Sequence, residues 1–258
     1  EPECDRERDR REDRHFGGQI VKRASPHGTH ETALCQLTRW YQRGHAARKS
    51  GPGENGVMAS HVALLRGINV GGRNKVPMAD LREVVTSLGH TGVSTYIQSG
   101  NVLFSTAEDD TAKLAAALES AIEDRFGIWS SVVVLSRDEL ARVLVANPYP
   151  DEPNPRMVHV VFLNGSPPRD LLDRITAAES AAAAKGSRDT VQLAGPAAGQ
   201  PPALFLHTPD GFGTSELAQN VLKILAPPKK SKPGLAATAR NWATATKLLS
   251  LSEENKED

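Results

Sequence analysis

The sequence predicts an α+β protein made of two units that follow one another along the chain, each with the order β-α-β-β-α-β and then a helix. Three observations lead to this class. The opening run to Arg14 lacks apolar periodicity, the character of the sequence changes abruptly at Met58, and the same order of strand and helix patterns then occurs twice. A chain of 258 residues is long enough for one large domain or two small ones.

The N-terminal segment, residues 1–57, has the composition of a disordered chain. It holds 11 Lys/Arg, 9 Asp/Glu, both cysteines and four of the eight histidines, and its opening run to Arg14 is nearly all charge of alternating sign. Such a run cannot bury enough apolar surface to offset chain entropy. We expect a disordered or non-native extension, with Met58 as the natural start. The segment has no apolar core of a signal peptide.

The first unit is expected over residues 58–146. Apolar residues alternate or run together where strands are predicted, and they recur every three or four positions where helices are predicted. Ser99-Gly100 is a two-residue hairpin signal, Gly127 ends a helix, and Ser136 with Glu139 forms a capping box. The predicted elements are, in order, Val62–Ile68, Pro77–Leu88, Val93–Gln98, Asn101–Ser105, Thr111–Phe126, Ser131–Leu135 and a helix to Ala146.

The second unit is expected over residues 157–251, after a Pro-rich loop, with a disordered tail at 252–258. Its predicted elements are Met157–Leu163, a helix capped at Ser166 and running to Ala183, Asp189–Leu193, Ala203–His207, Thr214–Leu225, Leu235–Ala239 and Asn241–Leu251. The order β-α-β-β-α-β is that of a ferredoxin-like sandwich, with both helices on one face of an antiparallel sheet. The other face must be covered, either by the second unit or by the extra helices.

Charge and cysteine content exclude several classes of function. The chain carries 31 Lys/Arg and 31 Asp/Glu, and residues 58–258 hold 20 and 22 of these, so neither part is basic enough to indicate nucleic-acid binding. No run of about 18 apolar residues predicts a membrane span. Because no cysteine follows Cys35, residues 58–258 offer no disulfide and no Cys-ligated metal. We expect a cytoplasmic protein without a metal or cofactor, and the sequence leaves its oligomeric state open.

The loop from Arg66 to Lys75, RGINVGGRNK, is the most unusual local sequence. Gly71-Gly72 permits positive φ and close approach of backbone N–H groups to a ligand. Three cations, at Arg66, Arg73 and Lys75, precede a predicted helix N-terminus, which suits a phosphate or another anion. The loop matches neither the P-loop nor the G-x-G-x-x-G pattern. The alternative is a plain β–α connection with its cations in solvent.

Other loops carry weaker signals. Gln98, Ser99 and Asn101 at the hairpin tip would orient a ligand, or would serve only as turn residues. His207 would be a general base or a strand-end histidine. Lys229 to Lys232 are expected in solvent. Arg240 would share a cleft with Arg66 or form a surface ion pair, and the neighbouring Asn241 would cap the last helix.

No nucleophile elbow, zinc or calcium motif occurs, so catalytic residues and enzyme activity stay open. Three motifs nevertheless resemble those of one family. These are VALLRGINVGG from Val62 with KVPM from Lys75, TYIQSGNV from Thr95, and TARNW from Thr238 with KLL from Lys247. Together they resemble the family of domain of unknown function 1697, over about 58–251.

The resemblance implies a bacterial α+β protein of two subdomains with no established activity. The family's signature positions correspond here to Arg66, Gly67, Asn69, Gly71, Gly72, Lys75, Gln98, Ser99, Gly100, Asn101, Arg240, Asn241, Trp242 and Lys247. Thr214 replaces the arginine that members often carry in a Gly-Arg-Ser turn, which weakens an anion site there.

Two functions remain as hypotheses. The first is a protein that binds a small anionic or phosphorylated ligand in a cleft lined by loop 66–75, through Arg66, Asn69, Gly71, Gly72, Lys75, Gln98, Ser99, Asn101, Arg240 and Asn241. The second is a protein-interaction or scaffold module with no small-molecule site. Nucleic-acid binding is a third, which the neutral charge disfavours, and no membrane partner is expected.

Overall fold

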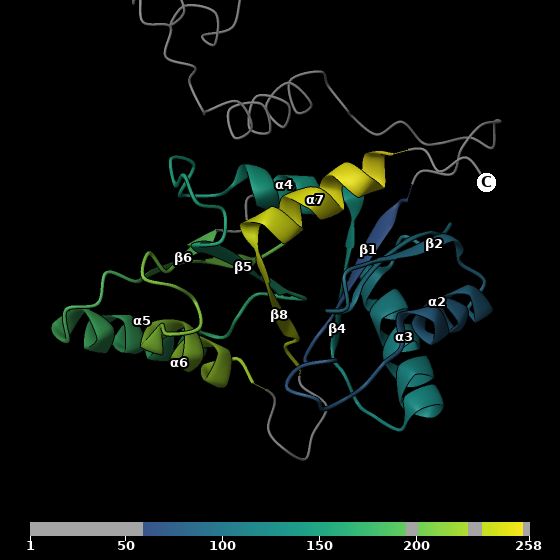
Figure 1. Cartoon of the computed structure of the whole chain (residues 1–258), viewed down its shortest axis with the longest axis horizontal. Helices are drawn as coiled ribbons and strands as arrows, with labels where there is room; N and C mark the ends of the chain where they lie inside the picture. The colour runs from purple at the N-terminus through teal and green to yellow at the C-terminus, as the bar shows by residue number, and fades with distance from the viewer. Residues whose placement is uncertain (1–58, 195–200, 227–233, 255–258) are drawn as a thin grey trace, which may run out of the picture. The chain divides into compact units, whose positions relative to one another are not determined.

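A computed structural model of the chain describes residues 59–194, 201–226 and 234–254, all within one compact unit. Figure 1 shows these residues in colour. The expectations about residues 1–57, the start at Met58, the cysteines and the lysines at 229–232 lie outside the described residues. Within them, the chain forms two four-stranded antiparallel sheets and six helices, so the predicted α+β class is confirmed.

The first half of the described chain, residues 59–146, contains one sheet with strand order β2-β3-β1-β4. Its elements are β1 (His61–Leu65), α2 (Met78–Ser87), β2 (Thr91–Tyr96), β3 (Asn101–Ser105), α3 (Thr111–Phe126), β4 (Val132–Ser136) and α4 (Arg137–Val145). Ala63 and Leu65 of β1 pack into a core with α2 and α3, which lie together on one face of this sheet (Figure 1). The alternate residues Val62 and Leu64 are equally buried, although they face the other way.

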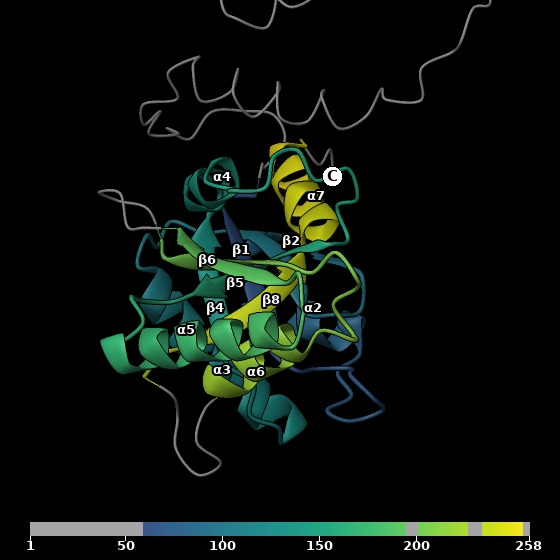
Figure 2. The same cartoon turned by 90° about the vertical axis from the view of Figure 1, so that its left-hand side faces the viewer.

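The second half, residues 157–254, repeats this arrangement with strand order β6-β7-β5-β8. Its elements are β5 (Val158–Leu163), α5 (Arg169–Ala184), β6 (Thr190–Ala194), β7 (Ala203–His207), α6 (Glu216–Ile224), β8 (Ala237–Asn241) and α7 (Trp242–Glu253). Figure 2 shows α5 and α6 side by side beneath this sheet. Their apolar faces meet Val161 and Leu163 of β5 in a second core.

A third buried layer joins the two halves. Helices α4 and α7 pack together, and α7 contacts β1 and β3 of the first sheet as well as β5 and β8 of the second (Figures 1 and 2). Trp242, Leu248 and Leu249 of α7 are buried, as expected for the apolar stripe of this helix. The edge strands β4 and β8 also contact one another. The extra helices therefore cover the sheet faces that α2, α3, α5 and α6 leave open.

Local signals predicted most helix ends. Asp110 caps α3 through the amides of Ala112 and Lys113, and Gly127 ends this helix at φ 64°. Ser136 and Glu139 form the predicted capping box of α4. Asn241 accepts a hydrogen bond from Thr244 N and caps α7 as expected. The helix then continues to Glu253, beyond the predicted end at Leu251, because Ser252 is buried and donates to Leu249 O.

Three boundary predictions were wrong. The hairpin turn spans the four residues Ile97–Gly100 rather than Ser99-Gly100, because Ile97 leaves the strand at φ 49°. Helix α5 begins at Arg169 and not near Ser166, since Pro168 disfavours helical conformation at the residue before it. Strand β8 runs over Ala237–Asn241, two residues later than predicted, and ends where α7 begins.

Two histidines whose pKa is lowered, His61 and the partly buried His159, make stability depend on pH. Burial lowers the pKa of His159, which stacks on Phe212 at a ring separation of 3.7 Å, from 6.5 to about 4. Burial also lowers the pKa of His61. Such a group stays neutral in the folded state while the unfolded chain takes up a proton, so stability is complete above about pH 6.5 and falls as the pH drops toward about 4.

For His159 alone, this linkage amounts to about 3 kcal/mol between pH 7 and pH 4. The matched variant is His159→Gln, and urea unfolding at a series of pH values is the measurement. We expect the variant to lose about 2–3 kcal/mol less stability over this range than the wild type. Parallel pH profiles for the two proteins would contradict the assignment.

Candidate functional site

Arg240 of β8 lies at the centre of the contact between the two halves. Its side chain is buried, and the described residues place no carboxylate within ion-pair distance of it. All three guanidinium nitrogens donate hydrogen bonds to protein oxygens instead. The acceptors are Leu65 O at 2.8 Å, Ser99 O at 3.0 Å, Gly100 O at 3.2 Å, Thr238 Oγ1 and Ala239 O at 2.8 Å each, and Asn101 Oδ1. Burial lowers the pKa of Arg240 to about 10, so it remains a cation at neutral pH.

Arg66 makes the reverse contact, from the first half to the second. Its Nη1 donates to Leu225 O at 3.0 Å and to Ala237 O at 3.1 Å, and its Nη2 donates to Leu222 O at 3.1 Å. These carbonyls lie at the C-terminal end of α6 and the start of β8. A cation there satisfies helix carbonyls that lack intrahelical partners and opposes the negative end of the helix dipole.

The two arginines therefore connect the halves reciprocally. Neither the predicted shared cleft nor a surface ion pair describes Arg240, because its donors are engaged by buried backbone and side-chain oxygens. Asn101 has the same role, since its Nδ2 donates to Tyr96 O and Ser99 Oγ while its Oδ1 accepts from Arg240. Asn241 is engaged as the cap of α7. The contacts of Arg66, Asn101, Arg240 and Asn241 therefore give these residues a structural role in the fold.

A second group of predicted residues lies outside this contact, on the loop 66–76, which we call the glycine loop and of which only Arg66 takes part in the contact. Asn69 fixes the loop, because its side chain bonds both the N–H and the C=O of Val76 and also donates to Gln98 O at 2.9 Å. Asn74 Nδ2 donates to Gly67 O. The glycine loop and the hairpin turn Ile97–Gly100 thus form one continuous, hydrogen-bonded surface.

The backbone of this surface is strained. Among the described residues, the three non-glycine residues with positive φ are Asn69 at 54°, Asn74 at 49° and Ile97 at 49°, and all belong to these two loops. Asparagine tolerates this region, whereas a β-branched residue such as isoleucine is an outlier there. Strain of this kind persists where surrounding structure enforces it, and it clusters at functional sites.

Several groups on this surface have no partner among the described residues. The side chains of Arg73, Lys75 and Gln98 are exposed and make no hydrogen bond or ion pair there. The amides of Gly71 and Gly72, at φ 58° and 76°, likewise donate to no described residue. Gln98 takes part only through its backbone oxygen. Free cations beside free amides are what an anion requires.

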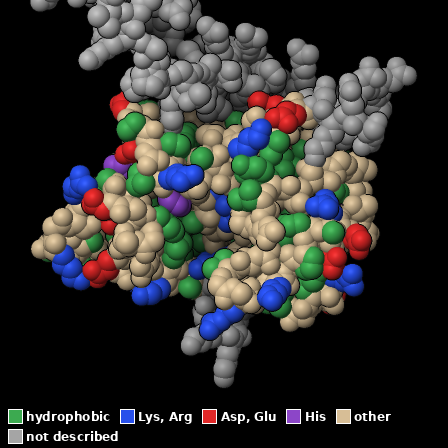
Figure 3. All heavy atoms as spheres, in the orientation of Figure 1, with side chains coloured by type: hydrophobic (Ala, Val, Ile, Leu, Met, Phe, Trp, Pro, Cys, Tyr) green, Lys and Arg blue, Asp and Glu red, His purple; other side chains and the backbone are tan. Residues whose placement is uncertain are grey.

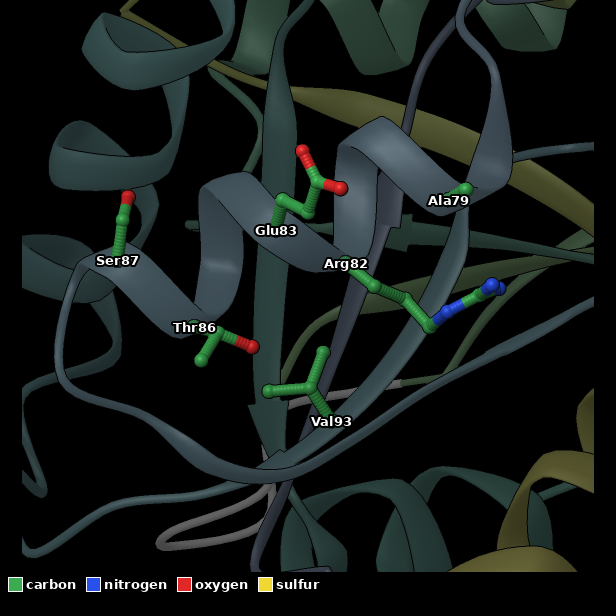
Figure 4. A pocket seen from close by; sticks show the side chains of 6 residues that line it. All are labelled: Ala79, Arg82, Glu83, Thr86, Ser87 and Val93. Carbon is green, nitrogen blue, oxygen red and sulfur yellow. The ribbon is translucent and has the colours of Figure 1, made fainter.

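A shallow hollow of about 610 Å³, which no sequence pattern predicted, lies beside helix α2. Figure 4 shows its lining residues, five of them from α2 and Val93 from β2, with Thr86 and Val93 directed toward one another. Arg82 crosses to Thr95 and donates to its Oγ1 at 2.9 Å. Its polar lining residues, Arg82, Glu83, Thr86 and Ser87, are all exposed, so the hollow is an open polar surface and not an enclosed, mostly apolar ligand pocket.

His207 forms a pair with the loop that connects the halves. Its Nε2 lies 2.6 Å from Glu152 Oε2, and its ring stacks on Tyr149 at 4.9 Å. The Tyr149 hydroxyl in turn lies 2.8 Å from Thr190 Oγ1. Among the described residues, no Ser, Thr or Cys side chain forms a hydrogen bond with His207, and the contacts of His207 and Tyr149 hold the connecting loop against β6 and β7.

Three further features of the described residues concern possible ligands: the distribution of basic side chains, the clustering of metal-ligating residues, and the length and polarity of the helices. On the face shown in Figure 3, Lys and Arg side chains are dispersed and do not gather into one broad basic patch. Within the described ranges, no three His, Cys, Asp or Glu residues are placed to hold a metal ion. In the same residues, each helix is too short or too polar to cross a bilayer.

Comparisons with known proteins agree with the motifs and the fold. The sequence model of a family described as "Protein of unknown function (DUF1697)" matches residues 58–191. A solved structure of a conserved bacterial protein from Streptococcus pneumoniae is similar, with 25% sequence identity and a TM-score of 0.52. The structural similarity covers 76% of this chain and 100% of that one, so it includes more of the chain than the residues 58–191 that the family model matches. No curated protein matches the chain.

Proposed function

The chain belongs to the DUF1697 family of proteins of unknown function, and from the contacts of its motifs we propose that it binds an anionic group on the glycine loop. The ligand is held by the cations Arg73 and Lys75 and by the amides of Gly71 and Gly72, with Gln98 at the edge of the site. Arg66 and Arg240 fix the scaffold and do not contact the ligand.

One observation carries this proposal. Arg66 and Arg240 have their donors engaged across the two halves, whereas Lys75 and the backbone amides of Gly71 and Gly72 are exposed and have no partner among the described residues. Free backbone amides in positive-φ turns form concave anion sites, and fixed geometry reduces the entropy lost on binding. Asn69 and Asn74 supply that fixed geometry through their bonds inside the loop.

The test uses inorganic phosphate and the variant Arg73→Ala/Lys75→Ala. We expect phosphate to raise the melting temperature of the full chain and the double variant to lose this shift, because both charges that face the anion are removed. The matched control is Lys113→Ala/Arg169→Ala, which removes two exposed cations that already pair with Glu108 and Asp173. An equal phosphate response in wild type, variant and control would defeat the proposal.

The proposal extends to organisation and location. We infer that 58–146 and 157–251 are two ferredoxin-like subdomains, which is supported by their shared element order and the equivalent strand orders of their sheets. Their reciprocal arginine contacts and the shared layer of α4 and α7 favour folding as one cooperative unit. A cytoplasmic location is part of the same proposal.

A further inference from the structure

Two large apolar side chains stand exposed beside the free cations of the glycine loop. Val70 is 65% exposed and Ile97 is 51% exposed, the two highest values among the large apolar residues described as exposed. Ile68 and Val76 of the same loop are buried. Because Asn69 bonds to Gln98 O, the neighbours Val70 and Ile97 belong to one surface.

Folding alone does not account for Ile97 at this position. An L-residue in the left-handed region costs about 1–2 kcal/mol, and asparagine or glycine would avoid much of that cost at φ 49°. Burial does not offset the strain, since half of the side chain is in solvent. Backbone strain clusters at functional sites, and here it falls on an apolar residue that shares its exposed surface with Val70.

The charge around this pair is positive. Arg73 and Lys75 have no acidic partner among the described residues. The nearest acids along the chain, Asp80 and Glu83 of α2, each lie 3.9 Å from Arg125. A complementary ligand therefore combines negative charge with apolar groups.

The apolar groups here favour a polypeptide over a nucleic acid. Single-stranded nucleic acids bind by stacking bases on aromatic side chains along a basic groove. Loop 66–76 and the turn Ile97–Gly100 contain no aromatic residue, and Lys and Arg are dispersed on the face in Figure 3. Aliphatic side chains on the same surface as free cations suit an acidic segment that carries apolar side chains.

We propose that the anionic ligand of the glycine loop is an acidic polypeptide segment. Its carboxylates pair with Arg73 and Lys75, and its apolar side chains contact Val70 and Ile97. This inference rests on the proposed function, because the same cations and amides hold the anionic part.

The test compares two anionic polymers, poly-glutamate and a random copolymer of glutamate and tyrosine, titrated calorimetrically into the full chain at low salt. We expect the copolymer to bind at least about tenfold more tightly than poly-glutamate, as burial of a small apolar area would give. Val70→Ser/Ile97→Ser should remove this difference and leave the response to phosphate unchanged. The control is Val145→Ser/Leu193→Ser, which changes two other exposed apolar residues.

A second variant separates recognition from folding. Ile97→Asn relieves the strain, so we expect a higher melting temperature together with weaker binding of the copolymer. Equal affinities of the wild type for both polymers would overturn the polypeptide inference and leave anion binding in place. If the wild type bound neither polymer nor phosphate, the proposed function would be defeated as well. If the wild type bound polyuridylate more tightly than the copolymer, the surface would be assigned to RNA and this inference would be overturned.

Discussion

Replacement of Arg240 by methionine is expected to destabilise the protein by about 3–5 kcal/mol, because several buried oxygens lose their hydrogen-bond donor at once. Methionine keeps much of the side-chain volume but donates no hydrogen bond. The carbonyls of Leu65, Ser99 and Gly100 and the amide oxygen of Asn101 would then lose a buried donor. Each buried acceptor left unsatisfied costs about 1–3 kcal/mol, partly recovered by relaxation.

Urea unfolding of the full chain measures this loss. The control Arg169→Ala removes an exposed arginine that pairs with Asp173 on α5, and we expect its unfolding midpoint to match that of the wild type. If Arg240→Met unfolded at the wild-type midpoint, its hydrogen bonds would not be what holds the two halves together.

The second large effect is expected for Gly100→Ala. Gly100 is at φ 74°, and an added Cβ would lie 2.7 Å from Leu65 Cβ and 2.9 Å from Ile68 Cδ1. The backbone conformation costs about 1–2 kcal/mol, and overpacking adds about 1–3 kcal/mol. Because Gly100 O also accepts from Leu65 N and Arg240, any shift of the turn weakens these bonds too.

Gly127→Ala is the matched control for this substitution. Gly127 has a similar φ of 64°, yet nothing lies within 4 Å of its added Cβ. The control should therefore show only the conformational cost, about 1–2 kcal/mol. Equal losses in the two variants, measured by thermal and urea unfolding, would show that Gly100 is required for its φ alone and not for close packing.

The architecture could be predicted from local patterns in the sequence. Thr111–Phe126 was predicted residue for residue, because its apolar stripe begins after Asp110 and ends at Gly127. The capping box of Ser136 and the cap at Asn241 could also be predicted, since a cap needs only a side chain that bonds a backbone N–H two or three residues along the chain. The repeated element order then led to the α+β class.

The roles of the motif residues were harder to predict, because they depend on contacts between distant segments. The Leu65–Arg240 bond joins residues 175 positions apart, and the bonds of Arg66 span 156 to 171 positions. In the sequence, an arginine near a glycine-rich loop is as compatible with binding an anion as with donating hydrogen bonds to backbone carbonyls. The exposed pair was missed because Ile97 was predicted inside the strand Val93–Gln98, where apolar residues are expected to be buried, and Val70 was treated only as part of the loop 66–75.

The central claim is that Arg66 and Arg240 join the two halves, while the exposed residues 70–75 of the glycine loop bind the ligand. Titration of nitrogen-15-labelled protein with inorganic phosphate, followed by amide and arginine Nε resonances, tests both parts in one spectrum. We predict saturable shifts at the amides of Gly71, Gly72 and Lys75, with the Nε resonances of Arg66 and Arg240 unmoved. Saturable shifts at those two Nε resonances, with the glycine amides unmoved, would contradict the account.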